Sequence, residues 1–238
     1  MANSISCSII IPCYNESKNL PLLVSRCTEV VKKDSNIEII IVDNGSNDDT
    51  SLVLDELTSS LTFITRVKIK VNQGYGHGIL AGLRAARGEI LSWTHADMQT
   101  DLGDALKGLD FFNSESNSEE LFVKGRRQGR PLADVFFTVG MSIFETLLLR
   151  KFMWDINAQP TMFHRKFFLT WNMPPKDFSL DLYAYYMAKK SRLGVKRFPV
   201  VFAERAHGVS NWNVSFISKY HFIKRTLLYS FGLQKRMR

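Results

Sequence analysis

The sequence predicts an α/β fold in which helices cover both faces of a mostly parallel central sheet. Short, almost continuous runs of Ile and Val, such as "CSIIIP" and "IEIIIV", are typical of strands that are buried on both sides. Each run is followed by a turn and a longer segment with helical spacing of its apolar residues, and this alternation favours a parallel sheet. With 238 residues, 45% of them hydrophobic, the chain can bury the core of one such domain.

The first half of the chain alternates most regularly. There we predict strands over Ser6–Ile11, Ile37–Val42, Arg66–Val71, Glu89–Trp93 and Leu121–Val123, and helices over Lys18–Lys32, Asp48–Ser59, Gly78–Ala86 and Asp101–Phe112. In the less regular second half we predict helices over Ala133–Leu149 and Leu180–Lys190 and strands over Pro160–His164 and Val195–Phe202. We find no internal repeat, and we expect one domain over residues 1–212 followed by a basic tail over residues 213–238.

The lengths of the hydrophobic runs and the pattern of cysteines indicate where in the cell the protein is expected. The runs are far shorter than the roughly 20 apolar residues of a membrane span, so we expect no such span. No basic region precedes the first strand, so we expect no signal peptide. Cys7, Cys13 and Cys27 form no CxxC pair. We interpret them as reduced thiols of a cytoplasmic protein, with Cys7 in the core.

The net charge of +8 is unevenly distributed along the chain. No acidic residue follows Glu204, whereas the tail is rich in lysine and arginine. A basic tail of this kind suits nucleic acid, anionic lipid or simple solubility, and composition does not rank these three partners.

Polar residues gather where four successive predicted strands end. The clusters are "PCYNES", "DNGSNDD", "NQGYGHG" and "HADMQTD", in chain order. In open α/β sheets, ligands bind in the crevice beyond the carboxyl ends of the strands. Although each cluster by itself also fits an ordinary turn, the four together predict a ligand site at this edge of the sheet.

The second cluster illustrates the two interpretations. A plain turn needs Gly45 at positive φ and Asp48 or Asp49 as the cap of the next helix. This turn does not use Asp43, whose carboxylate ends a buried strand and needs a partner. A base edge or a ribose hydroxyl would satisfy it, so we predict that Asp43 contacts a ligand.

The third cluster contains a glycine pattern with a second possible meaning. Gly76, Gly78 and Ala81 match the G-x-G-x-x-A dinucleotide fingerprint, and Asp97 lies near the offset of its ribose-binding acid. That fingerprint belongs to the first strand of a nucleotide-binding unit, however, and this copy follows the third. We therefore disfavour a nicotinamide enzyme and interpret the glycines as a flexible loop that closes on a ligand.

The fourth cluster carries candidate metal ligands. Asp97 and Gln99 alternate, so in extended backbone their side chains face the same side. Carboxylate and amide oxygens suit Mg²⁺ or Mn²⁺, with diphosphate oxygens completing the shell. We predict Asp101 as the N-cap of the following helix. We interpret His95 as a donor to phosphate or an ordinary strand-end histidine, rather than as a metal ligand.

These clusters together resemble family 2 glycosyltransferases of the GT-A fold, in the layout of dolichyl-phosphate mannose synthase-like enzymes. "SIIIPCYNESKNL" is similar to the family's opening strand and loop, "IEIIIVDNGSNDDT" to its nucleotide-binding segment, and "NQGYGHGILAGLRAARGEIL" to the helix that leads to its metal motif. "HADMQTD" stands in the place of that motif, "DAD.Q", and "FVKGRR" resembles a strand that carries basic residues toward the diphosphate. "DFSLDLYAYYMAKKSRLGVKRFPVVFAERAHGVS" resembles the closing stretch, with Asp181 at the acidic position and Arg205, Gly208 and Ser210 at "R..G.S".

The resemblance implies a nucleotide-diphosphate sugar donor, inversion at the anomeric carbon and a divalent cation, Mg²⁺ or Mn²⁺, on Asp97 and Gln99. It implies that Asp97, Asp181 and Arg205 are catalytic. The implied donor-binding residues are Pro12, Tyr14, Asn15, Glu16, Asp43, Asn44, Gly45, Gly74, Gly78, Ala96, Asp97, Arg126, Arg127 and Ser210. The chain departs from the family pattern at Asn44 and His95, which replace acids, at Asn211, which replaces a frequent lysine, and over Asp155–Arg165.

The acceptor stays open between two chemistries. A sugar hydroxyl needs a general base, for which Asp181 is the best candidate. A polyprenyl phosphate is already anionic and needs basic residues to hold it instead. On the donor side, Arg126, Arg127, Arg130 and Arg205 are candidates to supplement the cation at the leaving diphosphate with charge-assisted hydrogen bonds. The tail bears on this choice, because one predicted helical face carries Phe216, Tyr220, Ile223, Leu227 and Phe231 beside basic residues. Such a helix either lies peripherally on the inner, anionic membrane surface or packs its apolar stripe on the sheet.

Two other classes of protein are alternatives to a glycosyltransferase. A sugar nucleotidylyltransferase also combines such a sheet with a metal, but the sequence lacks its glycine-rich, basic N-terminal loop. A nucleic-acid-binding protein would explain the charge of +8 and leave the strand-end carboxylates without a role. We therefore expect no nucleic-acid partner. The base, the sugar and the oligomeric state depend on pocket and surface shape rather than on these motifs.

Overall fold

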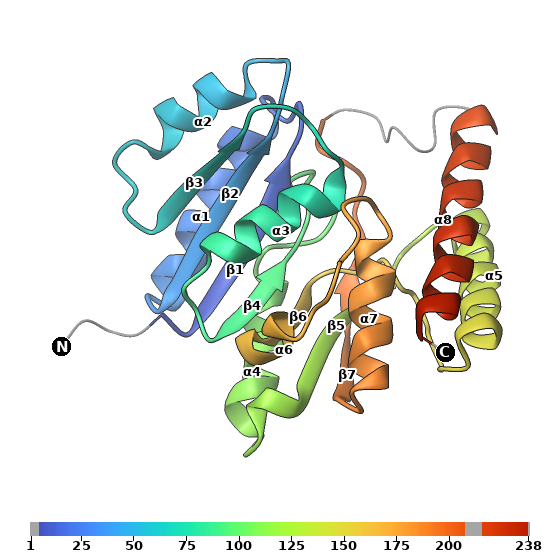
Figure 1. Ribbon diagram of the computed structural model, residues 1–238. Coiled ribbons are helices and arrows are strands. Elements are labelled where there is room, and N and C mark those ends of the chain that lie inside the picture. Colours follow the sequence, from blue (N-terminus) through green and yellow to red (C-terminus); the bar gives the residue numbers. More distant parts are fainter. Residues whose placement is uncertain (1–4, 208–215, 238) are drawn as a thin grey trace.

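The computed structural model describes residues 5–207 and 216–237, apart from the side chains of residues 216–222 and 237. Its centre is a seven-stranded sheet with the order β3-β2-β1-β4-β6-β5-β7 and helices on both faces (Figure 1). Neighbouring strands are parallel except for β6, which is antiparallel to β4 and to β5. The predicted α/β fold with a mostly parallel sheet is therefore confirmed.

The elements follow the predicted order. The strands are β1 (Cys7–Cys13), β2 (Ile37–Asn44), β3 (Ile64–Ile69), β4 (Ile90–Trp93), β5 (Leu121–Gln128), β6 (Thr161–His164) and β7 (Gly194–Val201). The helices are α1 (Leu20–Lys33), α2 (Thr50–Thr58), α3 (Tyr75–Ala85), α4 (Asp104–Ser114), α5 (Leu132–Leu149), α6 (Arg165–Leu169), α7 (Leu180–Lys190) and α8 (Phe216–Met237), with a short 3₁₀ turn η1 (Ser118–Glu120).

Three local predictions need correction. The third strand starts at Ile64 rather than Arg66, because it is an edge strand whose bounds follow its pairing with β2. The turns α6 and η1 were missed because they are too short for a periodic signal. Asp101 is not the N-cap of α4: Gly103 holds that position, and the Asp101 carboxylate accepts hydrogen bonds from Arg26 and from the Gly103 amide.

The strands have continuous apolar runs because both faces of the sheet are buried. On one face, Ile9 and Ile11 pack with the helices α1 and α4. On the other, Ile10 and Ile40 pack with α3 and α7. Cys7 is buried in the first of these clusters, as predicted, and all three cysteines are free thiols. The sheet is thus a rigid base for the loops at its carboxyl edge.

Helices α5 and α8 lie side by side at the edge of the domain (Figure 1). The Ser230 hydroxyl donates to Glu145 at 2.5 Å, the Gln234 amide donates to the Leu148 carbonyl at 2.8 Å, and the ring centroids of Phe144 and Phe231 are 6.1 Å apart. The described part of the tail thus packs on α5, a contact that neither of the two alternatives for the tail predicted. The side chains of Phe216 and Tyr220 lie outside the described residues.

Candidate active site

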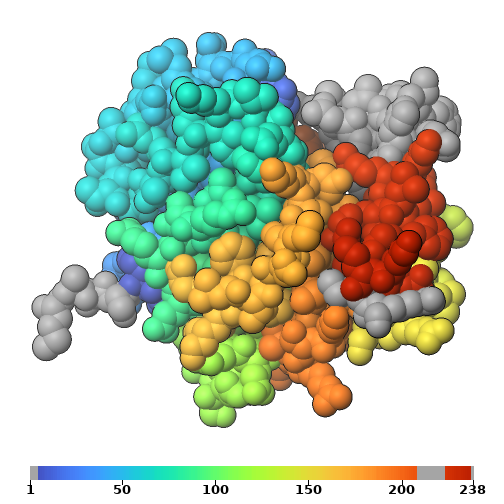
Figure 2. Space-filling model, in the orientation of Figure 1, coloured from blue at the N-terminus to red at the C-terminus, as the bar shows by residue number. Residues whose placement is uncertain are grey.

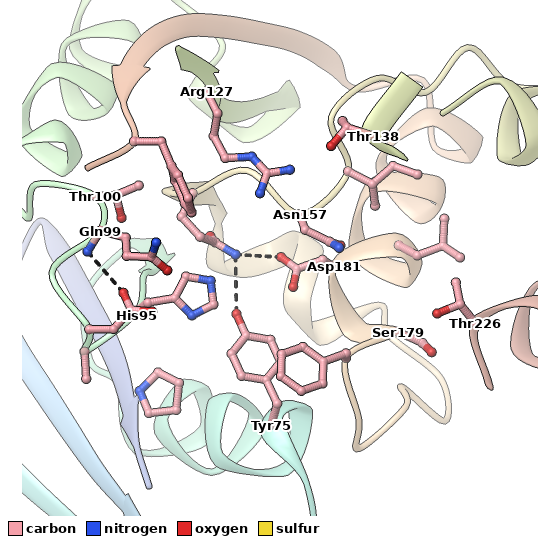
Figure 3. Close-up of a pocket in the computed structure, with 18 of the residues that line it drawn as sticks. Tyr75, His95, Gln99, Thr100, Arg127, Thr138, Asn157, Ser179, Asp181 and Thr226 are labelled. Carbon is pink, nitrogen blue, oxygen red and sulfur yellow. Dashed lines mark hydrogen bonds between the residues drawn. The ribbon is translucent and has the colours of Figure 1, made fainter. Parts of the chain in front are cut away.

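A cavity of about 530 Å³ lies at the carboxyl ends of the parallel strands. All four strand-end clusters contribute to its wall, through Tyr14 after β1, Asn44 at the end of β2, Gly74 after β3 and Asp97 after β4. This confirms the prediction that these clusters share one crevice. In Figure 3, His95 and Gln99 lie on the left of the cavity, Arg127 above it, Asp181 on the right and Tyr75 below.

Hydrogen bonds join the loops after β1 and β2. The Asn15 amide donates to the Ser46 hydroxyl at 3.0 Å, and the Asn47 amide donates to the Asn15 side-chain carbonyl at 2.8 Å. Asp43 is buried and accepts from the Ser46 amide at 3.0 Å. Asn15 and Asp43 therefore shape the rim of the cavity, and neither is among the residues that line it.

Two glycines permit the tight loops at this rim. Gly45 has a φ of +74°, and a Cβ atom there would lie 2.4 Å from the Asn72 amide nitrogen. Gly74 has a φ of +110°, and a Cβ atom there would lie 2.5 Å from the Lys176 carbonyl oxygen. Any other residue would strain the backbone and collide with it.

The candidate metal ligands converge on a cation that the chain itself supplies. The Arg205 guanidinium lies 2.7 Å from the Asp97 carboxylate and donates to the Gln99 side-chain oxygen at 3.2 Å. The Asp97 carboxylate also accepts from the Gln99 backbone amide at 3.1 Å, which fixes the turn. Two oxygens thus face one positive charge at the edge of the cavity.

His95 belongs to an aromatic wall of the cavity. Its ring stacks on Tyr75 at a centroid distance of 5.4 Å, and Tyr75 stacks on Phe178 at 4.6 Å. Burial raises the pKa of Tyr75 well above its ordinary value, so its hydroxyl stays protonated. The wall is therefore a stack of aromatic rings that suits the flat face of a base or a sugar.

Asp181 is held by a buried polar network beneath the cavity. It accepts a hydrogen bond from the Gln159 amide at 2.8 Å and from the Trp93 indole at 3.2 Å. The fully buried Lys124 ammonium lies 3.8 Å away and donates to the Thr161 hydroxyl at 2.6 Å. Burial lowers the pKa of Lys124 to about 7, although the Asp181 charge opposes the shift. Asp181 is therefore a fixed group rather than a freely rotating one.

Basic side chains reach the cavity from β5 and the loop that follows it. Asp155 accepts hydrogen bonds from the Arg127 backbone amide at 2.9 Å and from its Nε at 2.8 Å, and lies 3.9 Å from Arg130 and 3.7 Å from Arg197. Burial alone would raise the pKa of Asp155, but the charge and hydrogen bonds of Arg127 outweigh it and leave the pKa lowered. Arg127 and Arg130 line the cavity, whereas Arg126 is exposed and is not among the lining residues.

Some of the predicted site residues line the cavity, some do not, and two lie outside the described residues. The cavity is lined by Pro12, Tyr14, Glu16, Asn44, Gly74, Ala96, Asp97, Gln99, Arg127, Asp181 and Arg205. Asn15, Asp43, Gly45, Gly78 and Arg126 are not among its lining residues. Gly76 and Gly78, interpreted from the sequence as part of a flexible loop, lie instead in helix α3. A Cβ atom at Gly78 would lie 3.1 Å from the Asn44 side chain. Ser210 and Gly208 lie outside the described residues.

Several lining residues were missed by sequence reasoning. They are Tyr75, Asn157, Gln159, Phe178, Ser179 and Phe202. Most come from the second half of the chain, where Asn157, Phe178 and Ser179 lie in irregular segments and Phe202 directly follows β7. One signal was available, because Lys124 interrupts the apolar strand "LFVKG" and a buried lysine needs a partner.

A model of one protein family matches most of the chain. The match covers residues 8–172 and is to the family described as glycosyl transferase family 2. The chain belongs to glycosyl transferase family 2. The resemblance that the strand-end motifs predicted is therefore confirmed.

Curated members of glycosyl transferase family 2 are similar over part of their length. An undecaprenyl-phosphate 4-deoxy-4-formamido-L-arabinose transferase of Aeromonas hydrophila is 36% identical over 94 residues, which is 39% of this chain and 29% of the relative. A dolichyl-phosphate beta-glucosyltransferase of Trichomonas vaginalis is 33% identical over 127 residues, which is 50% of this chain and 39% of the relative. The chain thus spans well under half the length of these relatives.

Solved structures share the fold at low sequence identity. A mannosyltransferase from Pyrobaculum calidifontis, in complex with GDP-Man and Mn²⁺, has a TM-score of 0.69 at 19% identity, over 97% of this chain and 64% of that one. Glucosyl-3-phosphoglycerate synthase from Mycobacterium tuberculosis, in complex with Mn²⁺, UDP and glucosyl-3-phosphoglycerate, has a TM-score of 0.68 at 16% identity, over 95% of this chain and 80% of that one. The GT-A fold predicted for this family member is therefore confirmed.

Proposed function

We propose that this family 2 chain transfers a sugar from a nucleotide-diphosphate sugar to a polyprenyl phosphate, with inversion at the anomeric carbon. The observation that carries the proposal is the convergence of Asp97 and Gln99 on one cation, in a cavity that also holds Asp181 and two arginines. The names of the curated relatives, which are polyprenyl-phosphate transferases, support the choice of acceptor.

The charges of the cavity suggest how the two substrates divide it. The nucleotide lies against Pro12, Tyr14 and Asn44, so that its diphosphate reaches Arg205. The acceptor phosphate lies on the other side, where Arg127 keeps guanidinium hydrogens free beyond its bonds to Asp155. A phosphate oxygen then bonds to the anomeric carbon as the bond from that carbon to the diphosphate breaks. Holding both partners in line is the main contribution of these residues.

The donor set fits a divalent cation. Asp97 and Gln99 present two hard oxygens that already share a cation, although the described residues hold no cluster of three or more His, Cys, Asp or Glu side chains suited to a metal. Asp97 and Gln99 would hold Mg²⁺ or Mn²⁺ with the diphosphate oxygens. When bound, the cation would neutralise charge on the leaving group as a Lewis acid.

The position of Arg205 predicts that it competes with the metal. Arg205→Gln is expected to tighten Mn²⁺ binding by about tenfold in the absence of nucleotide, because a charge-assisted hydrogen bond to Asp97 no longer has to break. Electron paramagnetic resonance of free Mn²⁺ measures this without any turnover. Arg26→Gln, which removes a similar pair with Asp101 in the same segment, is the control and should leave the affinity unchanged. Weaker Mn²⁺ binding in Arg205→Gln would contradict the competition.

Asp181 distinguishes the two acceptor chemistries. An asparagine there can still accept from Trp93 and Gln159, so Asp181→Asn should fold. With a polyprenyl phosphate acceptor, kcat is expected to fall by no more than about tenfold, because no proton has to be removed. Steady-state transfer to a short-chain polyprenyl phosphate in detergent measures this. A loss of about a hundredfold or more would instead indicate a general base and a glycan hydroxyl acceptor.

The products of the reaction test the remaining alternatives. The proposal expects a nucleoside diphosphate as product. Release of pyrophosphate would identify a sugar nucleotidylyltransferase, and steeply salt-dependent oligonucleotide binding without nucleotide-sugar binding would identify a nucleic-acid-binding protein. The buried, free cysteines agree with action on the cytoplasmic side of the membrane, where thiols stay reduced.

A further inference from the structure

Helix α5 carries its polar and apolar sides in the reverse of the usual arrangement. A helix on the surface of a soluble domain normally turns its apolar stripe to the core. In α5, Leu132 is 87% exposed, Phe136 is 82% exposed and Leu147 is 74% exposed. The inner side instead holds Ser142, which is 2% exposed, and Glu145, which is 0% exposed. The apolar side of this helix therefore faces outward.

The exposed apolar side chains of the neighbouring helices α5 and α8 are grouped as one surface, which we call the outer face. On α5 they recur four or seven residues apart, and on α8 three residues apart, so each set lies along one side of its helix. The edge-to-face contact of Phe144 with Phe231 joins the two helices. Figure 2 shows α8 and the neighbouring α5 at the edge of the molecule. The outer face consists of Leu132, Phe136, Ile143, Leu147, Leu228 and Phe231.

Among the described residues, the exposed charged side chains on α8 and at the end of α5 are basic. Exposed Arg150 and Lys151 follow the end of α5, and exposed Lys224 and Lys235 flank the apolar pair on α8. The acids of α5 are Asp134 and Glu145, and both line the cavity on the inner side. An apolar surface with basic ends complements an anionic lipid bilayer, in which the apolar side chains enter the acyl boundary and the basic groups meet the headgroups.

The path of the chain does not suit an α5 that spans a membrane. Contrary to the expectation from run lengths, α5 has 18 residues with a mean hydropathy of 1.7 and is long and apolar enough to span a membrane. Its two ends, however, both connect to strands of the same sheet, β5 and β6. The segment that returns to β6 runs back along α5, since the amides of Met153 and Asp155 donate to Thr146 and Ser142 at 3.0 and 3.1 Å. A spanning α5 would carry this segment into the bilayer.

The cavity lies directly behind the outer face. Phe137, Thr138 and Met141 of α5 and Thr226 of α8 line it, so the same two helices separate it from the outer face. The face and the acceptor side of the cavity are thus two sides of one layer.

We propose that the outer face docks on an anionic lipid bilayer and holds the acceptor side of the cavity at the membrane surface. This inference rests on the proposed lipid acceptor. The sequence pointed to the tail by itself as the membrane-binding element, whereas the proposed surface is formed by α5 and α8 together.

Vesicle flotation of the full chain tests the proposal without turnover. The wild type should float with vesicles of phosphatidylcholine and phosphatidylglycerol, and much less with phosphatidylcholine alone. Phe136→Asp with Leu147→Asp should lower the bound fraction at least about tenfold, because two apolar side chains no longer enter the acyl boundary. Leu22→Asp with Leu52→Asp, at exposed leucines of α1 and α2, is the matched control and should float like the wild type. Each of Arg150→Gln and Lys235→Gln should weaken binding about fivefold.

Nucleotide titration of each variant shows that the cavity is intact, and the outcomes separate the docking from the function. Flotation of the wild type without transfer to any polyprenyl phosphate would uphold the docking and overturn the proposed acceptor. Transfer to a short-chain acceptor in detergent, with no flotation on either vesicle, would overturn the docking alone. A dimer in light scattering that Phe136→Asp with Leu147→Asp converts to a monomer, again without flotation, would assign the face to a second copy and also overturn the docking. Equal flotation of the variant and the control would do the same.

Discussion

Asp97→Asn is expected to lower kcat by about a thousandfold or more and to abolish metal-dependent binding of the nucleotide. Of the two proposed metal ligands, Asp97 and Gln99, only Asp97 carries a negative charge. The substitution removes that charge, so the pair would hold a cation beside the diphosphate much more weakly. Calorimetric titration of UDP, GDP and their sugar conjugates, with Mn²⁺ and with EDTA, measures the binding. The rate of sugar transfer from the nucleotide sugar that binds then gives kcat.

Asp101→Asn is the matched control for this result. It removes a carboxylate from the same segment, but that carboxylate is half exposed and pairs with Arg26 at 2.9 Å on the surface. Both nucleotide affinity and kcat should stay within about twofold of the wild type, since exposed pairs contribute at most about 1 kcal/mol. Metal-dependent nucleotide binding that survives in Asp97→Asn would show that the diphosphate is held elsewhere, and the proposed division of the cavity would fail.

Asp155→Ala is expected to lower the free energy of unfolding by about 3–5 kcal/mol. The alanine leaves Arg127 and Arg197 largely buried without their shared carboxylate, and an unpaired buried charge is among the costliest defects in a core. Urea denaturation followed by circular dichroism measures the change. Asp55→Ala, which removes an exposed pair with Arg66, is the control and should cost no more than about 1 kcal/mol.

The lowered pKa of Asp155 gives this prediction a pH dependence. A carboxylate whose pKa is lower in the folded state stabilises the fold above its unfolded pKa, which is about 4 for aspartate. That contribution is lost as the pH falls through the folded pKa. The difference between the wild type and Asp155→Ala should therefore be full near pH 7 and shrink below about pH 4. A difference that is constant from neutral to acidic pH would mean that the substitution acts through packing and not through charge.

The position of the site was predictable because the sheet is parallel. The apolar runs of β1, β2 and β4 identify the strands, and the carboxyl ends of parallel strands share one edge. The polar residues that follow each run must therefore meet, as Tyr14, Asn44 and Asp97 do. This inference needs only local patterns and one rule of topology.

The residues that complete the site were not predictable in the same way. Gln159, in the loop before β6, reaches Asp181 at the start of α7, and Arg205 reaches Asp97 from after the last strand. These contacts depend on how loops without periodicity fold over the edge of the sheet. Neither composition nor spacing constrains such long-range pairs.

Helix α5 shows, within a single element, the difference between what local sequence patterns predict and what tertiary contacts decide. Its residue types predicted a helix over Ala133–Leu149, and the structure has one over Leu132–Leu149. The sequence by itself thus determined the elements, their order and the edge of the sheet at which the candidate site lies, because these follow from periodicity and strand direction. Only the tertiary structure decided that α8 packs on the polar side of α5 and turns the apolar side outward, because side-chain burial depends on which neighbours a helix meets.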